Sequence, residues 1–380
     1  MMKNHMTKFI LLLWFMVISS FHCDNSEGYD KSRFQEPHPP YPYIVEEVSF
    51  TNGNDRATLA GTLTIPNLQG ESPAAVLISG SGLQDRDETI YNHKPFKVLA
   101  DYLTRQNIAV LRYDDRGAGH STGPMNNITP EHFAEDAYSA VQYLKSRDNI
   151  DAGKIGLIGY SMGAVEGSIL ASRYDDVAFL VMLGGPGIPL DEHMLLSDSV
   201  SNSRSGKTMD EIHAGQHLLR SMITEVKKGN STSITENSLK RIISEWRDPL
   251  PPHLIMPVKE FTKNNPNHWK QMASEWATPY FNFVINYDPY TALTEVSCPT
   301  LSLIGEKDVQ TLPEENSIGI RKAFENGKCI DYRVAIVTGV NHLFQKCETG
   351  TIDEYSRIEE TFHESVMEEI AAWIVKQVQE

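Results

Sequence analysis

Cysteine is scarce in this chain, and its arrangement excludes two kinds of structural support. Besides Cys23 near the N-terminus, the chain has Cys298, Cys329 and Cys347. Three cysteines cannot all pair within one chain, and their spacing matches no zinc pattern. A disulfide-rich scaffold and a structural zinc site are therefore excluded. Cys329 and Cys347 flank the last predicted strand, and the sequence leaves open whether they pair.

Positive charge is also in short supply. The chain has 34 Lys and Arg residues against 50 Asp and Glu residues, which gives a formal net charge of -16. Such a chain is repelled by nucleic-acid backbones and by anionic membrane surfaces, so we exclude both as main partners. We interpret the excess of acidic residues as an aid to solubility.

The N-terminal apolar run, residues 9–18, is too short to span a bilayer and follows Lys3 and Lys8. This pattern is typical of a signal peptide, which we place at residues 1–23. It predicts a secreted or periplasmic protein. Two endings are open, either simple cleavage near Ser20 or Cys23, or a lipid anchor on Cys23 that holds the chain at a membrane surface.

At 380 residues the chain is longer than one hydrophobic core usually supports, which predicts an insertion or a second domain. Residues 24–43 are polar and proline-rich and predict a tether. Short apolar segments then alternate with helical ones over residues 44–187, break at a helical cap insertion (188–295), and resume over residues 296–380. This alternation predicts an α/β fold with a doubly wound, mostly parallel sheet and an N-terminal β-hairpin.

The elements follow from the periodicity of apolar residues. The expected strands are 45–50 and 58–65 of the hairpin, then 74–78, 109–113, 155–158, 178–183, 300–304 and 332–337. The expected helices outside the insertion are 94–105, 130–146, 314–326 and 365–375. Inside the insertion, Thr208 and Glu211 predict a capping box at a helix start. The aromatic-rich segment 276–289 is interpreted either as a core seam or as an apolar wall over the active site.

The chemistry is indicated by Gly-Tyr-Ser-Met-Gly at residues 159–163. This motif follows an apolar strand and precedes a helix-compatible segment, so Ser161 is expected at the apex of a sharp strand-to-helix turn. The flanking glycines remove side chains that would clash with the neighbouring strand and helix. The turn places the Met162 amide at a helix N-terminus, where it can donate to an oxyanion. Ser161 is the candidate nucleophile.

A second G-x-S-x-G motif, at residues 119–123, is an internal control. Ser121 lies past the end of its strand and is soon followed by Pro124, so no helix can begin directly after it. The structural context that gives the motif its mechanism is thus expected at Ser161 and absent at Ser121.

A serine hydroxyl needs a base and the base needs an orienting acid, which on this fold lie at the carboxyl ends of strands. Among 13 histidines, His342 and His363 lie beyond the last sheet-like segments, and His342 directly follows a strand. Asp308 follows the preceding strand, whereas Asp331 lies at the opposite end of its own. The order Ser161, Asp308, His342 is the one expected for this topology.

The second oxyanion donor is expected in the glycine-containing loop after the strand 74–78. We assign it to the Ser81 amide, with the amides of Gly82 and Leu83 as near alternatives. The charged runs at residues 84–88 and 115–117 lie beside this loop and the next one. We interpret both as loop architecture and not as substrate contacts.

These residues together resemble the α/β-hydrolase superfamily, and within it a group of bacterial serine esterases. The resemblance covers nearly all of residues 43–374. Outside the serine motif it is carried by Ile-Ser-Gly-Ser-Gly-Leu-Gln-Asp-Arg-Asp-Glu-Thr (78–89), His-Lys-Pro-Phe (93–96), Leu-Arg-Tyr-Asp-Asp-Arg-Gly (111–117), Gly-Glu-Lys-Asp (305–308) and Asn-His-Leu-Phe-Gln (341–345). It implies a nucleophile at Ser161, an acid at Asp308, a base at His342 and a helical cap over the pocket.

One departure from that group lies at the serine motif. The group commonly has His before the serine and Glu-Gly-Gly after it, where this chain has Tyr160 and Met162-Gly-Ala. The main-chain amide of Met162 survives this change, so the oxyanion site is expected to survive too. The Met162 side chain is expected to make the floor of the pocket more apolar.

The sequence thus predicts a carboxylic ester hydrolase for small-molecule esters with short to medium acyl chains, without a metal or organic cofactor. A peptidase, an amidase or an acyltransferase on the same three residues is the alternative within the same chemistry. A catalytically silent binding protein on a hydrolase fold is the rival of another class. The oligomeric state is left open.

Overall fold

The computed structural model describes residues 33–228 and 236–379. The predicted signal peptide, Cys23 and the first part of the tether lie outside the described residues. The chain divides into two compact units, an insertion unit (Pro189–Asp288) and a sheet unit formed by the described residues before and after it. No helix in the described ranges is long and apolar enough to cross a membrane.

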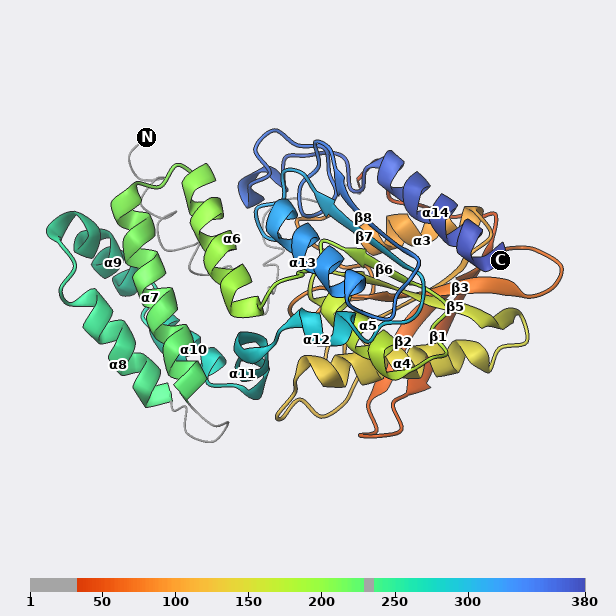
Figure 1. Ribbon diagram of the computed structural model, residues 1–380, viewed down its shortest axis with the longest axis horizontal. Helices are drawn as coiled ribbons and strands as arrows, with labels where there is room; N and C mark the ends of the chain where they lie inside the picture. Colours follow the sequence, from red (N-terminus) through yellow and green to blue (C-terminus); the bar gives the residue numbers. More distant parts are fainter. Residues whose placement is uncertain (1–32, 229–235, 380) are drawn as a thin grey trace. The chain divides into compact units, whose positions relative to one another are not determined.

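The sheet unit is built on one eight-stranded sheet in the order β1-β2-β4-β3-β5-β6-β7-β8 (Figure 1). Its strands are β1 (Ile44–Thr51), β2 (Thr58–Ile65), β3 (Ser72–Ile78), β4 (Ala109–Tyr113), β5 (Ile150–Tyr160), β6 (Leu180–Leu183), β7 (Thr300–Gly305) and β8 (Tyr332–Val337). The pairs β1/β2 and β2/β4 are antiparallel, and all others are parallel. The mostly parallel sheet and the N-terminal hairpin are therefore confirmed.

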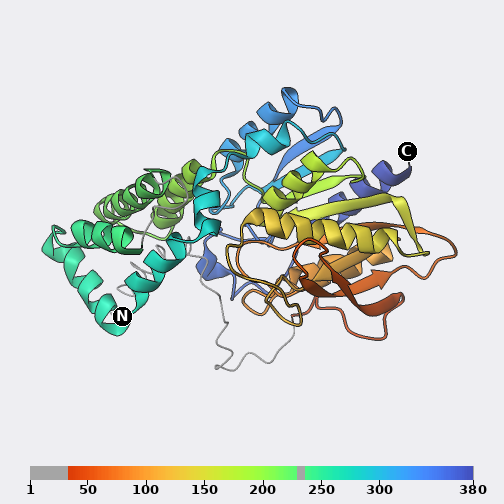
Figure 2. The ribbon, with the colours of Figure 1, turned by 90° about the horizontal axis from the view of Figure 1, so that it is seen from below.

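Helices cover both faces of the sheet, as a parallel sheet requires. On one face α3 (Pro95–Arg105) and α14 (Glu364–Gln379) pack on each other and close a core with apolar residues of the strands. The other face carries α4 (Pro130–Lys145), α5 (Met162–Arg173) and α13 (Pro313–Glu325), and Figure 2 shows α4 and α5 side by side. Buried members of the first core are Leu77, Leu99, Leu103, Val110, Ile158, Val181, Leu301, Ile370 and Ile374.

Strand β5 begins earlier than predicted, at Ile150 and not at residue 155. Its first half carries Asp-Ala-Gly-Lys at residues 151–154, which has no large apolar side chain and so lacks the signal of an apolar run. Ile150 is nevertheless buried and lies opposite Ser72 of β3, ahead of a register shift in that pair. Only the second half of β5 is buried on both faces, and that half produced the apolar signal.

The insertion is shorter than expected at its C-terminal boundary. Helix α12 (Pro289–Leu293) falls within the predicted range 188–295, yet it belongs to the sheet unit. The reason is packing, because α12 contacts α5 and α13. The Asp288-Pro289 step separates the two units.

The insertion unit consists of helices. These are α6 (Leu190–Arg204), α7 (Met209–Lys228), α8 (Glu236–Arg247), α9 (Pro252–Asn264), α10 (His268–Trp276) and α11 (Pro279–Asn286). The predicted capping box is present before α7, where the Glu211 amide donates to Thr208 Oγ1 at 3.3 Å and the Thr208 amide donates to Glu211 Oε2 at 2.7 Å. Trp276 and Phe281 are buried and their rings stack at 5.2 Å within the insertion unit, so this part of the aromatic segment packs inside that unit. Its role as a wall over the active site stays a prediction.

The predicted tether is docked where the structure describes it. Arg33 donates to the carbonyl oxygen of Ser356 at 2.8 Å, and Gln35 donates to that of Phe362 at 2.8 Å. Glu36 accepts hydrogen bonds from Lys94 and Lys97. Polar contacts, which leave no apolar pattern in the sequence, therefore hold this part of the predicted tether against the sheet unit.

Arg116 links the turn of the β-hairpin to α4 from inside the sheet unit. Its side chain is 0% exposed and pairs with Asp55 and, at 2.6 Å, with Asp136, which is 1% exposed. Its guanidinium also donates to the carbonyl oxygen of His132, which lies in the first turn of α4. The predicted role of this loop as architecture agrees with these contacts.

Arg116→Met is expected to lower the free energy of unfolding by about 3–5 kcal/mol, since it leaves the Asp136 carboxylate buried without its partner. Urea unfolding of the purified chain measures this. Arg173→Met is the matched control, because the Arg173–Glu131 pair is 42% and 47% exposed. We expect the control to lose at most about 1 kcal/mol, and equal losses in both variants would contradict the prediction.

Candidate active site

Ser161 lies between the last residue of β5 and the first residue of α5. Its backbone has φ 54° and ψ −115°, a strained conformation for a residue with a side chain. The Ser161 amide donates to the Leu183 carbonyl oxygen on β6 at 2.8 Å, which holds the turn in place. The strand-to-helix setting expected from the sequence is present.

The two glycines of the motif allow this turn to be tight. A Cβ on Gly159 would collide with the backbone of Gly163, and a Cβ on Gly163 would collide with the carbonyl oxygen of Ile78. Helix α5 therefore begins directly against β3 and β5, closer than any side chain permits. The contact with Ile78 also brings the turn next to the loop that follows β3.

His342 connects Ser161 to Asp308. Its Nε2 lies 3.1 Å from Ser161 Oγ, and its Nδ1 lies 2.6 Å from Asp308 Oδ2. The imidazole is 3% exposed and the aspartate 0%. With Nδ1–H donated to the carboxylate, Nε2 is left to accept the hydroxyl proton of Ser161.

Asp308 is itself fixed by the chain that follows it. Its Oδ1 accepts hydrogen bonds from the amides of Gln310 at 2.8 Å and Thr311 at 2.7 Å. Thr311 Oγ1 in turn donates to the carbonyl oxygen of Gly184 at 2.8 Å. The carboxylate thus has one oxygen held by the backbone and the other directed at the imidazole.

The sheet register explains why residues so far apart in the sequence meet. Tyr160 of β5 lies opposite Leu183 of β6, and Gly305 of β7 lies opposite Val337 of β8. The carboxyl ends of these parallel strands therefore share one edge, and the loops that follow them carry the three side chains.

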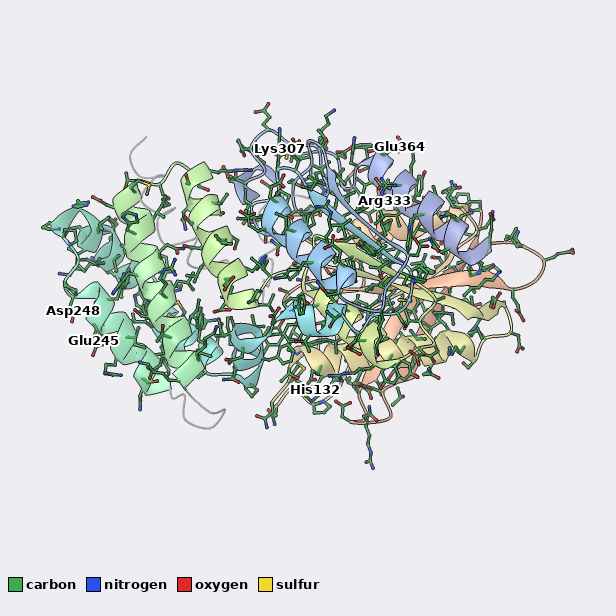
Figure 3. The ribbon with its side chains drawn as sticks, in the orientation of Figure 1. His132, Glu245, Asp248, Lys307, Arg333 and Glu364 are labelled. Atoms are coloured by element: carbon green, nitrogen blue, oxygen red, sulfur yellow. The ribbon has the colours of Figure 1, made fainter. Side chains whose placement is uncertain are left out.

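The loop that carries His342 is held by its own neighbours. Asn341 and Gln345 exchange hydrogen bonds through backbone and side chain, at 3.0 Å each. Lys307, labelled in Figure 3, donates to the carbonyl oxygens of Cys347 at 2.8 Å and Glu348 at 3.0 Å. These bonds fasten the segment after β8 to the loop after β7.

Sequence reasoning missed Gly184, which follows β6. Its φ is +61°, and a Cβ there would approach the His342 ring to 3.1 Å. A side chain at this position would be strained and would crowd the imidazole. The signal for it in the sequence is the Gly-Gly-Pro-Gly run at residues 184–187, which directly follows the expected strand 178–183.

Two backbone amides are the candidate oxyanion donors. Met162 begins α5, so its N–H has no partner within the helix. Ser81 follows Gly80, whose own amide donates to Glu88 Oε2 at 3.2 Å. The structure places the loop of Ser81 beside the Ser161 turn, and the choice of Ser81 over Gly82 or Leu83 stays a prediction.

The rejected candidates have structural partners. Ser121 is buried, donates its hydroxyl proton to the Asp114 carbonyl oxygen at 2.7 Å and accepts the Ala60 amide at 2.9 Å. His363 Nδ1 lies 2.8 Å from Glu360 Oε1. The second serine motif thus serves to join the end of β4 to β2.

The charged run at residues 84–88 acts as loop architecture, with partners beyond the run itself. Arg86 binds both carboxylate oxygens of Asp114, at 3.0 and 2.8 Å, and Asp87 pairs with Arg112 at 2.9 Å. Asp115 accepts hydrogen bonds from Ser79 Oγ and the Gln84 amide. Burial raises the pKa of Asp115 to about 7.

The described cysteines form no disulfide, and neither they nor the described acidic residues form a metal-binding group. Cys329 is a free thiol that donates to the Cys298 carbonyl oxygen at 3.1 Å, so the pair with Cys347 is not formed. Burial raises the pKa of Cys298 to about 12, which makes its thiol unreactive. Within the described ranges, no group of three or more His, Cys, Asp or Glu residues is placed to hold a metal ion.

A family model described as serine aminopeptidase, S33 (Hydrolase_4) matches residues 92–346. The chain belongs to this family. The S33 hydrolase is also 29% identical over 349 residues to Esterase EstD of Thermotoga maritima, which covers 91% of this chain and 71% of that protein. It is 25% identical over 161 residues to the human serine hydrolase BPHL, covering 40% of this chain and 51% of that one.

Solved structures share the fold of this chain. An esterase of Pyrococcus furiosus matches the S33 hydrolase with a TM-score of 0.50 at 15% identity, covering 89% of this chain and 91% of that one. DcsB in complex with its substrate analogue matches with a TM-score of 0.52 at 19% identity, covering 89% and 100%. At such identities the likeness concerns the fold alone, and it confirms the α/β-hydrolase fold predicted from the sequence.

Proposed function

We propose that this S33 hydrolase cleaves carboxylic esters of small molecules, with short to medium acyl chains, through an acyl-enzyme on Ser161. The observation that carries the proposal is the continuous chain of hydrogen bonds from Ser161 through His342 to Asp308. The relationship to Esterase EstD supports an ester as the substrate class.

In the first half of the proposed reaction, Ser161 Oγ attacks the ester carbonyl carbon and its proton moves to His342 Nε2. Asp308 stabilises the imidazolium that forms. The negative charge on the former carbonyl oxygen is met by the amides of Met162 and Ser81. The bond to the alcohol then breaks, the alcohol takes the proton from Nε2, and the acyl group remains on Ser161.

The second half repeats these steps with water as the nucleophile. Water gives a proton to His342 Nε2 and adds to the acyl carbon, and collapse of this intermediate returns the proton to Ser161 Oγ. The carboxylic acid is released and the resting enzyme is restored. The chain's own groups supply each proton acceptor and donor that these steps need.

A peptidase or amidase is the second candidate, favoured by the description of the matched family as serine aminopeptidases. The same three side chains serve both reactions, and only the leaving group differs. An ester and an amide with the same acyl group separate the two proposals. We expect kcat/KM to be far higher for the ester, and a preference for the amide, above all with a free amino terminus, would overturn the esterase proposal.

We also propose that the chain is exported, either released by cleavage near Ser20 or Cys23 or anchored through a lipid on Cys23. The Lys3 and Lys8 residues before the apolar run support a signal peptide. The intact mass of the mature protein from an expressing cell tests this. A mass that retains residues 1–20 would contradict export.

A further inference from the structure

Glu88 is a buried carboxyl group that the proposed reaction does not use. It is 4% exposed, and its Oε2 accepts the Gly80 amide at 3.2 Å. Its backbone has φ 53°, in the left-handed region that residues with side chains rarely adopt. The Glu88 amide donates to the Asp85 carbonyl oxygen at 3.0 Å, which closes this turn. Such strain persists where surrounding structure holds it, and it gathers at functional sites.

The carboxyl group reaches into the site from the far end of the loop after β3. A Cβ on Gly80 would meet Glu88 Oε1 and Tyr160 Cδ1 at 3.1 Å each, so both side chains pack against the Cα of Gly80 on the side where a side chain would project. The Tyr160 ring lies 5.1 Å from the His342 ring, centroid to centroid. The residue before Ser81 is thus held by Glu88 and by Tyr160, which itself lies beside His342.

We propose that Glu88 is the positioning residue of the oxyanion loop, which holds the Gly80 amide so that the Ser81 amide points at the developing oxyanion. This inference rests on the proposed function, because it needs an oxyanion to form at Ser161. Glu88 itself touches no substrate and acts through the backbone of Gly80. Arg86 and Asp87 anchor the same loop to Asp114 and Arg112 on its outer side.

The charge of Glu88 matters for this role. A carboxylate here places negative charge one residue from the amide that stabilises an oxyanion, so ionisation opposes catalysis. Burial and the nearby Asp115 hold the pKa of Glu88 well above its usual value. The uncharged acid still has an oxygen that accepts the Gly80 amide.

Four titratable groups face Glu88 from the elements around it. They are Asp85 of its own loop, Asp115 after β4, Tyr160 at the end of β5 and Glu166 on α5. Burial raises the pKa of Glu166 as well. As pH rises, Glu88 and these four groups lose protons, so negative charge accumulates in the cluster. Glu88→Gln removes the part of this charge that comes from Glu88.

The test compares Glu88→Gln with Glu88→Leu in the full chain, with an aryl ester as the substrate. For each variant, kcat and KM are measured at regular intervals between about pH 5 and about pH 10. Glutamine keeps the oxygen acceptor and cannot ionise, so we expect a kcat near wild type at neutral pH and a weaker fall on the alkaline side. Leucine removes the acceptor, so we expect kcat to fall by roughly 10- to 100-fold with KM little changed. Glu131→Gln, in the exposed pair with Arg173, is the matched control and should keep the wild-type kcat and pH profile.

The outcomes separate this proposal from the proposed function. If Ser161→Ala keeps the wild-type turnover, the proposed esterase mechanism itself fails. If turnover depends on Ser161 but Glu88→Leu keeps the wild-type kcat, Glu88 does not position the loop. Should the leucine variant fail to fold, Glu88→Asp replaces it, because the shorter side chain withdraws the acceptor oxygen from the Gly80 amide, and a wild-type kcat in that variant overturns the proposal.

Discussion

Ser161→Ala is expected to lower kcat for ester hydrolysis by roughly 10⁴- to 10⁶-fold, because no other group can form the acyl-enzyme. Binding of substrate and the oxyanion amides remain, so a small residual rate over water is expected. Folding should be unaffected, since the Ser161 backbone bond to Leu183 does not involve the side chain. Turnover of an aryl ester, together with labelling of the wild type by a fluorophosphonate, measures the effect.

Ser121→Ala is the matched control, because the chain offers a second serine in the same five-residue motif. Its hydroxyl group serves the Asp114 carbonyl oxygen and the Ala60 amide, both inside the sheet unit. We expect kcat to stay near wild type and the free energy of unfolding to fall by about 1–3 kcal/mol. Loss of turnover in a folded Ser121→Ala chain, or retention of turnover in Ser161→Ala, would contradict the assignment.

Asp308→Asn is expected to lower kcat by roughly 10⁴-fold, the size known for this change in a serine protease with the same arrangement. The asparagine oxygen can still accept the amides of Gln310 and Thr311, which directs its NH₂ group at His342. His342 Nδ1 must then accept, so the ring proton moves to Nε2 and the base can no longer take the serine proton. Kinetics at neutral pH measure the loss.

Asp331→Asn is the control for this second variant. Asp331 lies at the opposite end of β8, where it accepts a hydrogen bond from Gln377 at 3.2 Å. The substitution is equally conservative but far from the edge where the strands end, so kcat should stay near wild type. A similar loss in both aspartate variants, or none in Asp308→Asn, would show that Asp308 does not orient the base.

The residues that meet at the sheet edge could be predicted because each directly follows a strand. Ser161, Asp308 and His342 are identified by their place after an apolar run, and the sheet register does the rest. The same logic rejected Ser121, whose strand ends too early. The position of a residue in the sequence therefore predicts its place in the site when it follows a strand whose carboxyl end lies at this edge of the sheet.

The residues that sequence reasoning missed act through neighbours in space. Gly184 leaves room for the His342 ring, and Glu88 reaches Gly80 across its own loop. Docking of Arg33 and Gln35 depends on carbonyl groups far away in the chain. None of these contacts has a periodic signature, because each depends on where a folded backbone happens to place a single atom.

Because the sheet unit is formed by two stretches of sequence, the ribosome synthesises the residues of the proposed site in two separate stages. Strand β5 and Ser161 are synthesised first, then the whole insertion (Pro189–Asp288), and only afterwards β7 and β8 with Asp308 and His342. A nascent chain interrupted within the insertion holds the hydroxyl but neither the base nor its acid. On the proposed mechanism, chains truncated within the insertion are therefore expected to have no hydrolytic activity.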